Sequence, residues 1–137
     1  MSSEAQQLLA KELASLVQRL RVWSPARWAA ALDPWGTRAD LGRHLAQWLA
    51  DTAADLEGQP HRPLPALRPD LLVADQLAVT GDDLVRAAPD DARCQDAVAH
   101  VLAHRLDLLG EEPPESLGGH PTAVRGRQVC GREVCGP

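Results

Sequence analysis

The chain has 137 residues and a net charge of −5, and four Trp are its only large aromatic residues because Phe and Tyr are absent. This length suits one domain that can bury a core without disulfides or metal to hold it folded. Leu and Ala dominate the apolar residues, which favours packed helices over a sheet. The acidic balance disfavours nucleic acid as a partner.

The first helix is predicted from about Ser3 to Val22, and Ser3 can cap its start. Its apolar residues recur at helical spacing, at Leu9, Leu13, Leu16 and Leu20. Pro25 ends this helix, because proline disfavours helical geometry in the residue before it. Ser24 and Pro25 together are typical of the start of a short extra helical turn.

The N-terminal residues do not resemble a secretory signal, because MSSEAQQLLAKELASL has no basic segment followed by an uninterrupted apolar core. No stretch approaches the roughly 20 apolar residues that a membrane-spanning helix needs. We therefore expect a cytoplasmic protein with no membrane partner. Its three Cys are then expected to be reduced thiols rather than a disulfide framework.

A second helix is predicted to start after Thr37 and to end at Gly58. One face of this helix is apolar, and His44 lies at the edge of that face, about 40° from Trp48 on a helical wheel. His44 is therefore neither plainly a core residue nor plainly a solvent-facing one. A proline-rich connector over residues 59–65 then crosses to the next helix in extended form.

The third helix is predicted over Asp70 to Ala87, and the fourth from about Asp91 to Leu109 with Gly110 as its cap. Together the four segments predict an all-α protein. An antiparallel four-helix bundle is the simplest architecture for four such helices joined by connectors of several residues.

This bundle domain is expected to take up residues 1–110, and residues 111–137 form an irregular tail rich in Gly, Pro and Arg. The tail has too little apolar material to fold alone. It ends with Cys130 and Cys135, which together with His120 offer a second metal or redox site. An unstructured tail without such a role is the simpler interpretation of the same residues.

Three His residues define the candidate functional site. His100 and His104 are four residues apart, just over one helical turn, so both project from one side of the fourth helix. With His44 they supply three neutral imidazoles, which leaves one position of a divalent ion open for water, as in a catalytic site. Zinc is the first expectation, and nickel and iron also suit imidazole. Asp107 is a candidate catalytic base, or an acceptor that orients an imidazole.

An ordinary interpretation competes with this site. The fourth helix has an apolar arc that leaves His100, His104 and Asp107 about 160° away, where they would be surface residues. The arc consists of Val98, Leu102, Leu106 and Leu109. A wider apolar face through the residues in between, Ala97, Val101 and Leu108, would instead bring the His to the mouth of the bundle. Asp107 can equally be solvated, or paired with Arg105 or Arg43. The alternative function is a non-catalytic helical protein that forms a homodimer or binds a partner through an apolar face.

Three local segments carry a resemblance to a known family. They are LRVWSPARW at 20–28, WGTRADLGRHLA at 35–46, and HRLDL at 104–108 with His100 one turn earlier. These segments resemble a leucine-rich helix with a Trp-bearing exit, a Trp before the first metal His, and a His-x-x-Asp stretch. Such segments are found in the DinB-like superfamily of helical bundles, and more particularly in mycothiol-dependent maleylpyruvate isomerases. The resemblance covers roughly residues 5–112.

The resemblance implies a DinB-like bundle in which His44, His100 and His104 hold the metal ion. It further implies a low-molecular-weight thiol such as mycothiol at the open position, and an isomerase or transferase reaction on a small molecule. The spacing between His44 and His100 is shorter than in the full family domain. The substrate does not follow from these residues.

Overall fold

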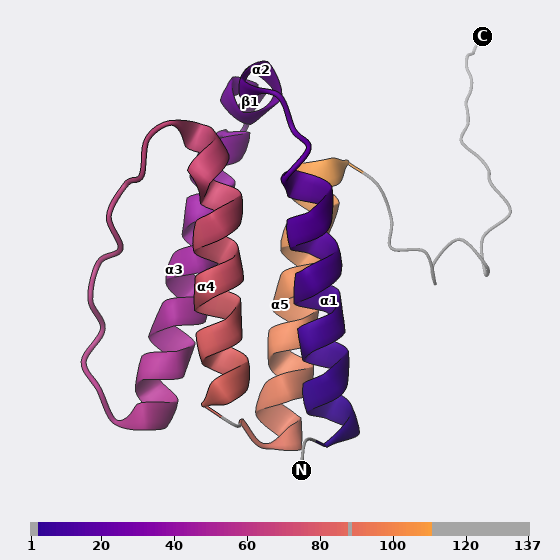
Figure 1. The fold of residues 1–137 in the computed structure, drawn as a ribbon, viewed down its shortest axis with the longest axis vertical. Helices are drawn as coiled ribbons and strands as arrows, with labels where there is room; N and C mark the ends of the chain where they lie inside the picture. Colours follow the sequence, from indigo (N-terminus) through magenta and orange to yellow (C-terminus); the bar gives the residue numbers. More distant parts are fainter. Residues whose placement is uncertain (1–2, 88, 111–137) are drawn as a thin grey trace, which may run out of the picture.

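The computed structural model of the chain describes residues 3–87 and 89–110, and these residues form a helical bundle (Figure 1). The predicted tail over 111–137, with Cys130, Cys135 and His120, lies outside the described residues. Within them, Cys94 is a buried free thiol. None of the helices in this part of the chain is long and apolar enough to cross a membrane.

Helices make up most of the described chain, as predicted. Their bounds and those of two short strands are α1 Glu4–Leu20, α2 Pro25–Ala29, β1 Ala31–Leu32, β2 Gly36–Thr37, α3 Arg38–Glu57, η1 Asp70–Leu72, α4 Val73–Arg86 and α5 Asp91–Leu109. The third predicted helix is therefore divided, because its first three residues form the 3-10 turn η1 after Pro69 and the α-helix begins only at Val73.

The helix ends follow local chemistry that was visible in the sequence. The side chains of Ser3 and Thr37 each accept a hydrogen bond from the backbone N–H three residues later, at 3.1 Å. Ser24 caps α2 in the same way, ahead of Pro25 at the first position of that helix. Gly58 and Gly110 end α3 and α5 with φ values of 70° and 71°, a left-handed conformation that glycine adopts without penalty.

A two-stranded antiparallel hairpin between α2 and α3 was not predicted. Its register pairs Ala31 with Thr37 and Leu32 with Gly36. Each strand has only two residues, so the overall composition carries no trace of them. The hairpin matters for the site because its turn contains Trp35, whose backbone N–H donates to the carbonyl of Leu32 at 2.8 Å.

The four long helices occupy the corners of the bundle, and α1 and α3 are each in contact with α4 and α5. Helix α3 descends in Figure 1, the connector over 58–69 climbs back along it, and α4 descends again. Twelve extended residues reach about 40 Å, which exceeds the roughly 30 Å length of a 20-residue helix. The simple antiparallel order is therefore wrong for two pairs of helices. Helices α3 and α4 run parallel, and so do α1 and α5.

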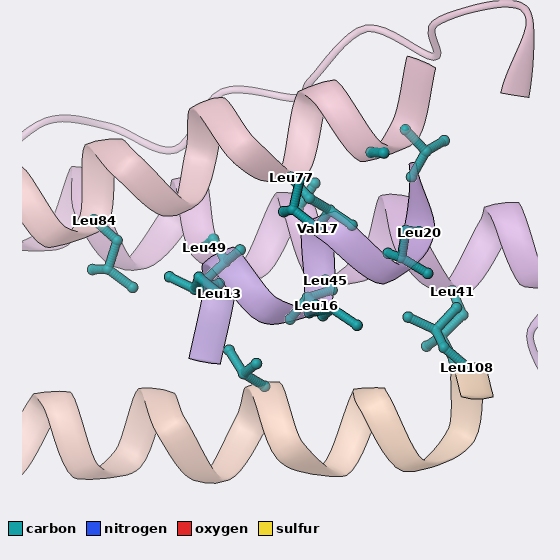
Figure 2. Close-up of a cluster of buried hydrophobic side chains, with 14 of the residues drawn as sticks. Leu13, Leu16, Val17, Leu20, Leu41, Leu45, Leu49, Leu77, Leu84 and Leu108 are labelled. Carbon is teal, nitrogen blue, oxygen red and sulfur yellow. The ribbon is translucent and has the colours of Figure 1, made fainter. Parts of the chain in front are cut away.

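Leucine side chains from all four long helices fill the interior, as Figure 2 shows for residues such as Leu13, Leu45, Leu77 and Leu108. The buried face of α5 differs from the expected apolar arc. It consists of Cys94, Ala97, Val98, Val101, Arg105, Leu108 and Leu109, whereas Leu106 is 37% exposed. The face is thus rotated toward the side that carries His100 and His104, and both of these side chains are half-buried.

Candidate functional site

The structure brings the three candidate His rings together where α3 meets α5. His44 lies in the second turn of α3, and His100 and His104 lie on successive turns of α5. The ring centroids of His44 and His104 are 5.6 Å apart, and those of His100 and His104 are 6.3 Å apart. Imidazoles from two separate helices therefore lie close together, and a shared metal ion stays a prediction.

Two Trp rings extend this cluster at both ends. Trp35, from the hairpin turn, lies 4.7 Å from the ring of His44 and 6.1 Å from the ring of His104, measured between centroids. Trp48 stacks on His100, with centroids 4.0 Å apart and planes 22° apart. We call these five residues, Trp35, His44, His104, His100 and Trp48, the ring row. Two of the four Trp thus flank the candidate site rather than serving only as core anchors.

The ring of His104 has one nitrogen satisfied and one without a partner. Its Nδ1 lies 2.7 Å from the carbonyl oxygen of His100, and because a carbonyl only accepts, the proton of a neutral ring sits on Nδ1. The other nitrogen, Nε2, then carries a lone pair, and it is buried with no hydrogen-bond partner. This tautomer is the one in which a metal-binding His presents Nε2 to an ion.

Burial is the main cause that lowers the pKa of His104 below its ordinary value. The hydrogen bond to the carbonyl of His100 opposes this effect, the neighbouring His44 and His100 add to it, and Asp107 opposes it weakly. The ring is therefore held in its neutral form near pH 7, which is the form that ligates a metal.

Asp107 is exposed on α5, and in the described part of the chain it has no hydrogen bond or ion pair. The two Arg that were considered as its partners are engaged elsewhere. Arg105 is buried and its Nη1 donates to Ser15 Oγ at 3.3 Å, and Arg43 pairs with Asp70. The ion-pair interpretation of Asp107 is therefore wrong, and its catalytic role stays a prediction.

Two arginines, Arg43 and Arg38, hold the elements around the ring row through contacts that the sequence did not indicate. The guanidinium of Arg43, next to His44, donates to Asp70 Oδ1 at 2.5 Å and to the carbonyl of Leu67 at 3.2 Å, and it lowers the pKa of Asp70. The guanidinium of Arg38 donates to the carbonyl of Leu108, which ties the start of α3 to the end of α5. No sequence pattern indicates these contacts, because both partners are distant along the chain.

As the side chains stand, no three His, Cys, Asp or Glu among residues 3–87 and 89–110 form a group that could hold a metal ion. The planes of His44 and His104 are only 18° apart, so these rings present faces to each other, whereas a ligating nitrogen directs its lone pair within the ring plane. Metal binding at this place therefore requires at least one ring to turn. His44 is exposed, so it can rotate without disturbing the core.

Comparison with known proteins gives no relative, since no protein-family model, curated protein or solved structure matches the chain. The resemblance to the DinB-like superfamily therefore depends on the segments at 20–28, 35–46 and 104–108 alone. It stays a prediction, together with the ligand set and the thiol chemistry that it implies.

Proposed function

We propose that His44, His100 and His104 bind one divalent metal ion, with zinc as the first choice and nickel or iron as alternatives. The observation that carries this proposal is the lone pair of His104 Nε2, which is buried without a partner. Leaving a buried polar atom unsatisfied costs about 1–3 kcal/mol, so such an atom calls for a partner, either a bound ion or a water. A metal ion would satisfy this nitrogen directly.

The separations of the rings support the same assignment. A zinc–nitrogen bond is about 2.0–2.1 Å long, so a ligating ring has its centre roughly 3.2 Å from the ion, and two rings in a tetrahedral site lie about 5.2 Å apart. The observed separations of 5.6 and 6.3 Å are longer than this by about 0.4 and 1.1 Å. Metal binding would therefore require the side chains to turn their nitrogens toward the ion and to bring the rings slightly closer together.

We further propose that the protein is a DinB-like four-helix bundle acting in the cytoplasm as a metal-dependent thiol transferase or isomerase. When bound, the ion would lower the pKa of a water or a low-molecular-weight thiol at its open position and so provide a nucleophile at neutral pH. Trp35 and Trp48 would offer apolar walls to a small organic substrate. The charge of Asp107 reaches His104, and we assign this carboxylate the role of proton acceptor at the mouth of the site.

Calorimetric titration of zinc into chelator-treated full-length protein tests the metal site. Cys130→Ser and Cys135→Ser are included in every sample so that tail thiols do not bind the metal. We expect one zinc per chain, and a loss of affinity of at least about 100-fold in His44→Ala, His100→Ala and His104→Ala, since outer-shell changes alone cost 10–100-fold.

His61→Ala is the matched control. This His lies on the connector outside the ring row, with a side chain 52% exposed and bonded to Asp55 at 2.7 Å. Zinc affinity is expected to be unchanged in this variant, and circular dichroism confirms that each variant is folded. The proposal fails if zinc does not bind, or if the variants of the ring row bind it as tightly as the control does.

A further inference from the structure

A shallow apolar groove of about 780 Å³ runs between α1 and α4. These helices lie in front of α5 and α3 in Figure 1, so the groove is on the side of the bundle opposite to the ring row. Small side chains on both helices keep it open, among them Ala10, Ala14, Ala78 and Gly81. Val79, on its α4 side, is 61% exposed. The groove is therefore an apolar surface that water does not favour.

Both helices that border the groove carry charged side chains, and α4 is the more acidic of the two. Helix α1 carries Lys11 and is followed by Arg21, and α4 carries Asp75, Asp82 and Asp83. Opposite charges are present as well, since Glu4 and Glu12 lie on α1 and Arg86 of α4 pairs with Asp82 at 2.8 Å. Arg21 pairs with Asp75 at 2.8 Å within the chain. Among the described residues Lys11 and Asp83 have no ion pair, although both are exposed. One border thus presents an unpaired positive charge and the other an unpaired negative charge.

Lys11 and Asp83 also lie at nearly the same height along the axis of the bundle. Helices α1 and α4 run antiparallel (Figure 1), with Leu13 beside Gly81 and Arg21 beside Asp75. Counting from these two contacts places Lys11 near the level of Asp83. A partner with the same two helices at the same level would therefore meet each unpaired charge with its opposite.

We propose that a second copy of this chain occupies the groove and forms a homodimer whose two-fold axis is parallel to the helices. In this arrangement α1 of each copy packs on α4 of the other, and Lys11 faces Asp83 of the second copy. The other two-fold axis in the plane of the groove, perpendicular to the helices, would stack α1 on α1 and α4 on α4. That arrangement sets α4, which carries three Asp and one Arg, against the same acidic helix of the second copy, which is unfavourable across an interface.

The size of the groove indicates a weak and reversible dimer. Helices of 17 and 14 residues give a face of on the order of 20 Å by 23 Å. This is at the low end for specific protein interfaces, so we expect a dissociation constant on the order of 10 µM. Val79 of each copy would fill the space above the small side chains of the other.

Sedimentation velocity across concentrations from low to several hundred micromolar tests this interface, with chelator present so that the outcome is independent of any metal site. The wild-type chain is expected to pass from monomer to dimer. Ala14→Arg, in the groove, is expected to raise the dissociation constant at least about tenfold. Ala99→Arg changes an exposed Ala on α5 and is expected to leave the constant unchanged.

Charge reversal tests the direction of the two-fold axis. Lys11→Glu and Asp83→Lys are each expected to weaken the dimer, because each places like charges opposite one another. The two changes combined are expected to restore it, because the pair is attractive again. Monomer at every concentration, equal weakening by Ala99→Arg, or no recovery in the combined variant would overturn the proposal. Both charged side chains are exposed, so these variants keep the fold intact.

Discussion

Two buried glycines in helix interiors respond differently to alanine, because their surroundings differ. A Cβ at position 42 in α3 would lie 2.7 Å from Val73 Cγ1 and 3.4 Å from Trp28 Cζ3. Both neighbours are fully buried, so they cannot move aside without straining the core. In a helix interior, alanine stabilises the folded protein by about 1 kcal/mol relative to glycine. Forcing an extra methyl group into a packed core destabilises it by about 1–3 kcal/mol. The net effect is a loss of up to about 2 kcal/mol, and because the nearest contact is only 2.7 Å we expect Gly42→Ala to lower the free energy of unfolding by an amount toward this upper end.

Gly81→Ala is the matched comparison. A Cβ at position 81 would meet only the end of one flexible side chain, with Leu13 Cδ1 at 3.1 Å and Cδ2 at 3.3 Å, beside an open groove. A shift of a few tenths of an ångström relieves this contact, so the helix-forming preference of alanine dominates. We expect Gly81→Ala to raise the free energy of unfolding by about 0.5–1 kcal/mol.

Urea unfolding followed by circular dichroism measures both changes, at a protein concentration low enough to keep the chain monomeric. The two variants are expected to differ by about 2 kcal/mol, with Gly42→Ala the less stable. Equal stability, or the reverse order, would refute the close packing of α3 against α2 and α4 at position 42.

Three further predictions concern charged groups. Arg43→Met is expected to lower the free energy of unfolding by about 1–2 kcal/mol in the same urea assay, because it removes the nearest partner of Asp70 and leaves only Arg68 among the described residues, at 2.7 Å; a loss below about 0.5 kcal/mol would contradict the pair. The pKa of His61 is raised, chiefly by its hydrogen bond to Asp55 and also by the charge of Asp51, so the contribution of protonated His61 to stability is complete below pH 6.5 and fades as pH rises through the raised value; proton NMR should show this pKa fall toward its ordinary value in Asp55→Asn. The pKa of His104 is lowered, so the unfolded chain binds more protons, and metal-free protein should lose stability as pH falls from about 6.5 through the lowered value; an unchanged pH slope in His104→Gln would count against a buried ring.

The helix ends could be read from the sequence, because a cap is a contact among neighbouring residues. The starts of α1 and α3 are capped by Ser3 and Thr37 as expected, and α3 and α5 end at Gly58 and Gly110 as expected. The parallel direction of α3 and α4 could not be read in this way. It depends on a proline-rich connector that runs the whole length of the bundle, and a connector of this composition is compatible with several paths.

The candidate site was predicted in part. The spacing of His100 and His104 placed both on one side of α5, and the resemblance suggested His44 as their neighbour. The narrow apolar arc of the helical wheel was wrong at Leu106, which is exposed, and it did not indicate that Arg105 is buried. The wider face through Ala97, Val101 and Leu108, which the sequence offered as the alternative, is the one that is buried. A helical wheel uses only the polarity of the residues of one helix, whereas the packing of the neighbouring helices decides which side of that helix is buried. The unpartnered Nε2 of His104 depends on the exact position of one ring, which no sequence pattern indicates.

X-ray absorption at the zinc edge tests the proposed metal centre most directly, using full-length protein loaded with one equivalent of zinc. We predict three imidazole nitrogens at about 2.0–2.1 Å, one further light atom, and no sulfur. The imidazole signal is expected to weaken in His44→Ala and to stay unchanged in His61→Ala. Sulfur at about 2.3 Å would assign the metal to Cys130 and Cys135, and fewer than two imidazoles would contradict a centre built from α3 and α5.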